Sequence, residues 1–306
     1  MYVLTLFFSL VDFRFSPSGP ASESICHTLP KFQKSEMAQA MALNERLLEP
    51  ARELIARCIT ELNWEDLSED TVMDIGCGGF FLCTRALLEK FPRMGCLLAV
   101  DKFRTISNEI KEDEFFAEYF RNNSLQFHLA DITDSSSLEF YRGLIHKIVS
   151  RNMLQHVTDK EMAFQHMYDL LRPGGHAAVL FCIENPVETW RLIISTSTNW
   201  EQYRRNEIIL FYAANLEDGY YENVLEDIGF RVVRCERSDV QHQFENDQTL
   251  LTKLLSLATI FLKIPEDKMT QFKEESVKLF KELIGYSGSG PLRYEISDLL
   301  LLAIKP

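Results

Sequence analysis

The chain has 306 residues, 46% of them hydrophobic and 25% charged, a balance typical of a globular protein with a sizeable core. Its 32 Lys and Arg against 45 Asp and Glu give a net charge of −13. No basic stripe interrupts this acidic composition. We therefore exclude nucleic acid and an anionic membrane surface as expected partners.

Seven cysteines are spread along the chain without a CxxC pair. Their odd number and their spacing match neither a metal-ligand set nor a disulfide framework, so no metal is predicted. Several lie in apolar runs, where a thiol behaves as a small hydrophobic group. This usage is typical of a reducing compartment, and we expect a cytoplasmic protein.

The N-terminal stretch Tyr2–Val11 is apolar but shorter than the roughly 20 residues of a membrane-spanning helix, so no membrane span is predicted. No Lys or Arg precedes it and no small-residue cleavage pattern follows, which disfavours a signal peptide. The next stretch is rich in Ser, Pro and Gly. Residues 1–34 are therefore predicted to be a disordered extension, and residues 35–306 the folded domain.

A helical pattern runs from Ser35 to Leu62, with Pro50 as a predicted kink or break. Short apolar runs then alternate with helical stretches, as expected for a parallel sheet covered by helices on both faces. The predicted strands are Thr71–Ile75, Cys96–Asp101, Leu125–Asp131, His146–Arg151 and His176–Ile183, and the predicted helices between them are Leu82–Lys90, Thr105–Arg121 and Lys160–Leu171, the last followed by a turn at Arg172–Gly175.

The alternation pauses after the fifth strand, and the segment Glu184–Leu216 is rich in aromatic residues. Further along, the pattern predicts a helix at Gly219–Ile228, a strand at Phe230–Arg237, helices at Asp247–Phe261 and Glu266–Ile284, and a last strand at Glu295–Ile304. The fold class is therefore α/β, with a Rossmann-like, seven-stranded, mostly parallel sheet. Segments of about 184–218 and 246–285 are predicted to form a helical cap.

A glycine-rich turn connects the first strand to its helix, with the sequence Asp74-Ile75-Gly76-Cys77-Gly78-Gly79. Such a turn lets the backbone approach a ligand closely and directs helix N–H groups toward polar groups. Asp101 and Asp131 close the next two strands, where carboxylates can accept hydrogen bonds from a ribose and from an adenine amino group. Ligands bind at this edge of a parallel sheet. A single Asp after a strand is usually a turn or cap residue, but three at successive strand ends indicate a nucleoside cofactor.

A nicotinamide or flavin domain is the nearest alternative. Its fingerprint is G-x-G-x-x-G, whereas the run from Gly76 to Phe81 has no glycine at the sixth position. The Pro-Gly-Gly turn before the fifth strand and the late helix–strand pattern favour a methyltransferase.

The chain resembles the class I S-adenosylmethionine-dependent methyltransferases and, among them, the juvenile hormone acid methyltransferases of arthropods. The motifs that carry the resemblance are Asp74–Gly78, Leu129–Ile132, Tyr168–Gly175, Glu184-Asn185-Pro186, Trp200–Tyr203 and Leu225–Phe230. It extends from about Glu36 to Lys281. The core motifs occur in many methyltransferases and specify the cofactor rather than the acceptor.

The resemblance implies S-adenosylmethionine as cofactor and methyl transfer to the carboxylate of a small apolar acid. The implied cofactor-binding residues are Asp74, Gly76, Cys77, Gly78, Asp101, Lys102, Asp131, Ile132 and Ser150. The N-terminal helix is expected to cover the cofactor, and aromatic residues of the cap between Trp190 and Tyr220 to line the acceptor pocket or to pack a core. The sequence pattern predicts no particular oligomeric state.

The sequence departs from the family pattern at four places. Phe80 stands where the loop usually has a third glycine, Leu47 replaces a glutamine, Ile145-His146 replaces an aromatic-Asp pair, and Leu154–Val157 reads Leu-Gln-His-Val instead of Leu-His-Trp-Val. Gln155 and His156 are therefore the candidate catalytic residues. His156 either holds the acceptor carboxylate, as a neutral donor or a cation, or is a structural histidine.

These departures keep alternatives open. Hydroxyl and amine acceptors remain possible, as does a peptide or protein acceptor, although an acidic protein with an aromatic cap disfavours a large basic substrate. A protein with this fold that binds ligands but has weak or no catalytic activity is the alternative from another functional class.

Overall fold

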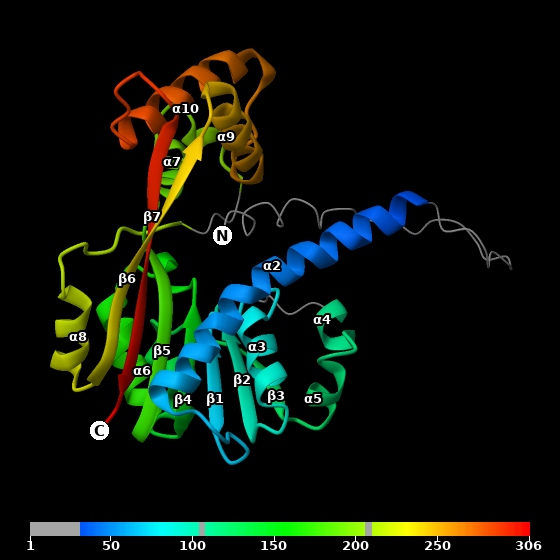
Figure 1. The fold of residues 1–306 in the computed structure, drawn as a ribbon, viewed down its shortest axis with the longest axis vertical. Coiled ribbons are helices and arrows are strands. Elements are labelled where there is room, and N and C mark those ends of the chain that lie inside the picture. The colour runs from blue at the N-terminus through cyan, green and yellow to red at the C-terminus, as the bar shows by residue number, and fades with distance from the viewer. Residues whose placement is uncertain (1–30, 104–107, 206–209) are drawn as a thin grey trace, which may run out of the picture.

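The computed structural model describes residues 31–103, 108–205 and 210–306. In these residues seven strands form one sheet in the order β3-β2-β1-β4-β5-β7-β6 (Figure 1). Strands β1 to β5 are parallel and β7 is antiparallel to both of its neighbours, which confirms the predicted fold class. The strands are β1 Thr71–Ile75, β2 Cys96–Asp101, β3 Leu125–Leu129, β4 Ile145–Arg151, β5 Leu171–Glu184, β6 Arg231–Phe244 and β7 Leu292–Ile304.

Helices cover both faces of the sheet because its central strands are apolar on both sides. On one face, α2 (Lys31–Leu62) and α3 (Leu82–Lys90) pack over Val72, Ala99 and Val149. On the other face, α6 (Lys160–Leu170) and α8 (Tyr220–Ile228) pack over residues such as Met73 and Ile148. Each fully buried aliphatic side chain contributes about 1.5–3 kcal/mol, so these two clusters hold the sheet in place.

The helix α2 runs through Pro50 without interruption, so the predicted division at that residue is wrong. Leu48, Ala51 and Leu54 on both sides of Pro50 are buried in the cluster with α3, which holds the helix together despite the missing N–H group. The helix begins at Lys31, four residues before the predicted start. The rest of the predicted disordered extension lies outside the described residues.

The single helix predicted at Thr105–Arg121 is wrong. Two short helices are present, α4 (Asn108–Glu112) and α5 (Ala117–Arg121). Asp113 lies between them, and its Oδ1 accepts a hydrogen bond from the Phe115 backbone N–H at 2.9 Å. Asp side chains that bond to the backbone two residues later favour a turn, which explains the break.

The turn predicted at Arg172–Gly175 is an irregularity inside β5. The pairing of β5 with β4 jumps from Leu171 to His176, and Gly174 has φ of +74°. The Gly174 N–H donates to Lys305 O and the Gly175 carbonyl accepts from Lys305 N–H, so this bulge is held by the chain just after β7. Glycine is required at Gly174 because other residues are strained at positive φ.

The strands β6 and β7 are longer than predicted. The strand β6 continues past Arg237 to Phe244, and β7 begins at Leu292 instead of Glu295. Residues 240–244 of β6 pair with residues 292–296 of β7, beyond the last pairing of β7 with β5. This two-stranded ribbon projects from the sheet and carries α7 (Pro186–Thr196), α9 (Asp247–Phe261) and α10 (Met269–Leu283), as Figure 1 shows. Short 3-10 helices occur at Ser135–Tyr141 (η1), Leu154–His156 (η2), Glu201–Tyr203 (η3) and Glu266–Lys268 (η4).

The cap helices enclose an apolar core of their own. Trp190 and Trp200 are 0% and 1% exposed and pack with Phe272 and Phe280 between α7, α9 and α10. Trp190 and Trp200 therefore pack the core of the cap, which is one of the two roles expected for aromatic residues of this segment. In the described ranges, no helix is both long and apolar enough to cross a membrane.

Candidate functional site

A pocket of about 200 Å³, the sheet-end pocket, lies at the carboxyl ends of β1, β2, β3 and β4. It is the edge where a parallel sheet binds ligands. All predicted site residues except Ser150 and Gln155 line it: Asp74, Gly76, Cys77, Gly78, Asp101, Lys102, Asp131, Ile132 and His156. The described residues of α2 and of the cap helices do not line it.

The glycine turn forms one wall of the pocket. Gly76 and Gly78 have φ of +78° and +63°, values that residues with a Cβ rarely adopt. The N–H groups of Gly76 and Cys77 both donate to Val100 O on β2, at 2.8 and 3.1 Å. A Cβ on Gly76 would lie 2.4 Å from Met153 Cγ, so the turn and the end of β4 meet only because this residue is glycine.

Phe80 and Phe81 connect the turn to α3. Phe80 is half-buried and lines the pocket, so a bulky side chain lies in the site at the place where the family pattern has a third glycine. Phe81 is fully buried with φ of +49° and packs against Phe116 and Phe127, at ring distances of 5.8 and 6.2 Å. A bulky residue in this left-handed conformation is strained, and its burial holds the entrance to α3 in place.

Asp74 is 1% exposed at the end of β1. Its Oδ2 accepts a hydrogen bond from Thr84 Oγ1 at 2.6 Å, whereas Oδ1 has no hydrogen-bond partner among the described residues. Burial raises the pKa of Asp74 to about 7, with the Thr84 hydrogen bond opposing that rise. A buried acceptor atom without a partner on a pocket wall is costly, which is expected where a ligand supplies the missing donor.

The other two acids are held in defined orientations. Asp101 Oδ2 accepts from Gly78 N–H at 3.0 Å and Oδ1 from Phe103 N–H at 2.9 Å. Asp131 Oδ1 accepts from both the N–H and the hydroxyl of Thr133. Each carboxylate keeps lone pairs for further donors. Ile132, beside Asp131, is buried, as expected for a side chain that packs against a planar ring.

The glycine turn and the three strand-end acids lie within the part of the chain that a protein-family model matches. A family model described as "Methyltransferase domain" matches residues 66–227, more than half of the chain. The chain belongs to the methyltransferase-domain family. It is an S-adenosylmethionine-dependent methyltransferase.

Two curated relatives carry the name juvenile hormone acid O-methyltransferase. The protein from Drosophila melanogaster is 22% identical over 233 residues, covering 75% of this chain and 77% of the relative. The Bombyx mori protein is 22% identical over 235 residues, covering 74% and 81%. Among solved structures, the YcgJ protein of Bacillus subtilis superimposes with a TM-score of 0.52 at 14% identity, covering 84% of this chain and 98% of that one, which shows the shared fold.

Two predicted site residues do not reach the pocket of this methyltransferase. Ser150 is buried and its Oγ donates to Ile75 O at 2.8 Å, joining β4 to β1. Gln155 is buried with Oε1 lacking a hydrogen-bond partner among the described residues, while its backbone carbonyl accepts from Tyr212 N–H. The Ser150 contact is structural, and neither side chain lines the sheet-end pocket.

His156 reaches the pocket with one nitrogen already engaged. Its Nδ1 lies 2.9 Å from Leu210 O, and because a carbonyl only accepts, this contact requires a proton on Nδ1. The neutral ring therefore carries a lone pair on Nε2. Burial lowers the pKa of His156 to about 4. Neutral His156 in this tautomer thus cannot donate from Nε2 to a carboxylate, and the predicted role as a carboxylate holder would require the cation, which burial disfavours.

Arg151 lines the pocket although it is not among the predicted site residues. It is the last residue of β4, is 8% exposed, and lines the pocket next to Asn152 and Met153. A cation at the end of a buried apolar strand was the available signal. No group of three or more side chains suited to a metal ion occurs in the described ranges.

Proposed function

We propose that this methyltransferase transfers a methyl group to the carboxylate of a small apolar acid. The proposal is carried by the similarity along three quarters of the chain to two proteins named for methylation of an acid oxygen. The pocket supports it, because its wall is mostly apolar, with Phe80, Phe103, Ile132 and Met153 among the lining side chains.

The cofactor residues are proposed on the same geometry. The backbone of Gly76, Cys77 and Gly78 would approach the amino-acid portion, and the unpaired Oδ1 of Asp74 would accept from its ammonium group. Asp101 and Lys102 would bind the ribose. Asp131 would accept from the adenine amino group with Ile132 against the ring. When bound, S-adenosylmethionine supplies an electrophilic methyl group on a sulfonium.

An acid acceptor can be methylated without proton transfer to the protein. A carboxylate with a pKa near 4–5 is already ionised at neutral pH, so no general base is required. The work of the pocket is to hold the oxygen in line with the methyl group and to exclude water. The apolar wall suits both tasks.

A screen with labelled cofactor tests the proposal. The acceptors are long-chain fatty acids, farnesoic-type acids, phenols and amines, each at matched concentration. We expect methyl esters from the apolar acids. Methylation of phenols or amines with no reaction on acids would contradict the acid proposal and leave the methyltransferase activity intact.

A hydroxyl or amine acceptor is the second candidate, and the His156 tautomer favours it. With Nδ1 donating to Leu210, Nε2 can accept a proton from an O–H or N–H acceptor. On that reading, His156→Ala lowers turnover by about 10²–10⁴-fold with cofactor affinity unchanged. On the acid reading, turnover falls far less. His156→Gln serves as the control that keeps side-chain volume.

A non-catalytic binding protein is the remaining alternative, and Phe80 on the pocket wall motivates it. Calorimetric titration with S-adenosylmethionine decides this question. Absence of binding at millimolar cofactor would refute the enzyme proposal.

A further inference from the structure

Arg151 is a buried cation for which the described part of the chain provides no hydrogen-bonded counter-charge. The residue is 8% exposed, and its Nε has no hydrogen-bond partner among the described residues. A guanidinium withdrawn from water costs several kcal/mol unless it is paired. Natural cores retain such a group where a ligand supplies the pairing.

Two carboxyl groups lie near Arg151, and neither compensates it directly. Asp74 and Asp298 both interact with the Arg151 charge through space, yet Asp74 Oδ1, Asp298 Oδ1 and Arg151 Nε all lack a hydrogen-bond partner among the described residues. Burial raises the pKa of both acids, so Asp74, with a pKa of about 7, is only partly ionised near neutral pH. The positive charge is therefore left available on the pocket side, where Arg151 lines the wall.

The strand register brings Arg151 to Asp74. Asp74 on β1 pairs with Val149 on β4, and Arg151 lies two residues further on the same face of the sheet. The pocket wall thus carries a donor from β4 and an acceptor from β1, each with an unpaired buried atom. A planar guanidinium matches a carboxylate, with which it forms two parallel hydrogen bonds.

We propose that Arg151 is the carboxylate-binding residue of the sheet-end pocket. Two carboxylates are available there, the α-carboxylate of the cofactor's amino-acid portion and the carboxylate of an acid acceptor. The chemistry that recognises them is the same. This inference rests on the proposed function only in taking the pocket as the ligand site and, for the second source, in taking an acid as acceptor.

Titration calorimetry with matched ligands tests the proposal. The first pair is S-adenosylhomocysteine and its decarboxylated analogue, which keeps the ammonium group. The second pair is dodecanoic acid and dodecanol, titrated with and without S-adenosylhomocysteine. A charge-assisted hydrogen bond is worth roughly 10- to 150-fold in affinity, so we expect a preference of that size for one carboxylate ligand over its partner in the wild type.

The variant Arg151→Gln should abolish that preference, and Arg151→Lys should restore part of it, since Lys keeps the charge but not the planar fork. Loss confined to S-adenosylhomocysteine identifies the cofactor carboxylate, and loss confined to dodecanoic acid identifies the acceptor. Arg85→Gln is the matched control. Arg85 is paired with Asp113 at 3.2 Å and stacks on Phe115, so the preference should stay unchanged.

Three results would overturn the proposal. One is a wild-type protein that binds neither carboxylate better than its partner ligand, a measurement that needs no variant to fold. Another is an equal loss of affinity for both members of a pair in Arg151→Gln, which indicates a structural residue. The third is an unchanged preference in Arg151→Gln. Failure of the proposed function is a separate outcome. In that case the carboxylate preference would still be measured, but no methyl ester would form from apolar acids.

Discussion

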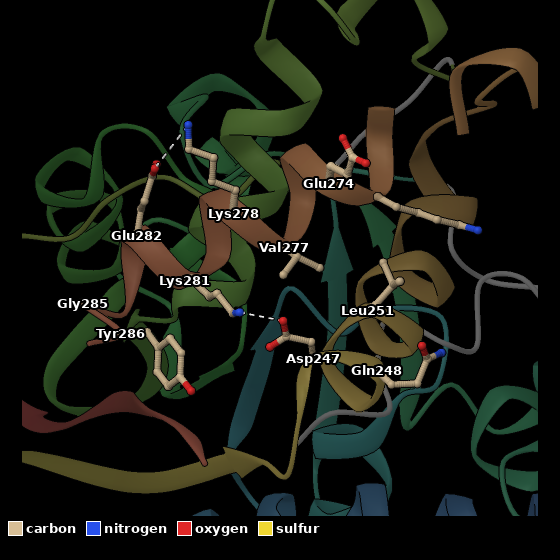
Figure 2. A pocket seen from close by; sticks show the side chains of 11 residues that line it. Asp247, Gln248, Leu251, Glu274, Val277, Lys278, Lys281, Glu282, Gly285 and Tyr286 are labelled. Atoms are coloured by element: carbon tan, nitrogen blue, oxygen red, sulfur yellow. Dashed lines mark hydrogen bonds and ion pairs between the residues drawn. The ribbon is translucent and has the colours of Figure 1, made fainter. Parts of the chain in front are cut away.

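Two concave regions of this methyltransferase differ in size and in the state of their polar groups. The larger is an open groove of about 620 Å³ between α9 and α10, the cap groove (Figure 2). Four of its charged side chains form two ion pairs that reach solvent, Lys281 with Asp247 at 2.7 Å and Lys278 with Glu282 at 3.9 Å. The sheet-end pocket is smaller, but its Asp74 and Arg151 are buried and each has an unpaired atom.

The two regions differ in what a ligand would change, because the sheet-end pocket has unpaired buried polar atoms on its wall and the cap groove has charged groups that reach solvent. Exposed charges are solvated at little cost, so the cap groove requires no ligand. Buried groups without partners are costly, so the sheet-end pocket is expected to gain stability when a ligand fills it. The predictions below test this difference.

The largest effect is expected in the cap. Trp200 is buried, packs edge-on against Phe272 at a ring distance of 5.0 Å, and donates from Nε1 to Glu275. Trp200→Ala should lower the free energy of unfolding by about 3–5 kcal/mol, because it leaves a large cavity. Denaturant titration measures this. Trp200→Phe should lose less, and the cofactor affinity of the folded variant should match the wild type; a loss of affinity would make the cap part of the site.

A substitution in the glycine turn should lower cofactor affinity. Gly76→Ala places a Cβ 2.4 Å from Met153 Cγ at a φ of +78°, so strain and overpacking of about 2–4 kcal/mol are expected. To the extent that the turn shifts to relieve this contact, S-adenosylhomocysteine affinity should fall, by at most about 30- to 1,000-fold, as measured by calorimetry. Gly78→Ala is the matched control, since no atom lies within 4 Å of its added Cβ. Equal losses in the two variants would contradict the role assigned to the Met153 contact.

Asp74 should make cofactor affinity depend on pH. With a pKa of about 7 in the ligand-free protein, Asp74 is protonated below that value and must ionise to pair with an ammonium group. Affinity should therefore fall as pH decreases, by roughly tenfold between pH 7.5 and 6. The charge of Asp101 raises the pKa of Asp74 and that of Arg151 lowers it. His156, with a pKa of about 4, stays neutral throughout this range.

Proton release measured in buffers of different ionisation enthalpy checks the assignment. The wild type should release protons on binding below pH 7. Asp74→Asn should bind with a flat pH profile and without proton release. A variant that keeps the wild-type profile would place the titrating group elsewhere.

The smallest effect is expected in the cap groove. Lys281→Gln removes the ion pair with Asp247, whose side chain is 60% exposed. The free energy of unfolding should change by about 1 kcal/mol or less, with no change in cofactor affinity. Thermal unfolding and calorimetry measure the two quantities. A larger loss of affinity than in the Gly78→Ala control would reverse the comparison between the two regions.

The parts of the fold that were predictable are those fixed by neighbouring residues. The strand Thr71–Ile75, the glycine turn and the helix Leu82–Lys90 match β1, the loop and α3 because apolar runs and glycines act locally. The helix break at Asp113 was missed because a side-chain hydrogen bond overrides the helical pattern there. The length of β6 was missed because its outer half is stabilised by pairing with β7, far along the chain.

The sequence by itself determined the turn at Gly76 and Gly78 and the acids at the strand ends, since backbone conformation and the order of residues after a strand are local properties. Only the tertiary structure decided which side chains share the pocket. Strand order brings Arg151 beside Asp74, and a contact with Leu210 sets the proton on His156. Burial and pairing through space depend on residues distant in the chain, and these give both groups their chemistry.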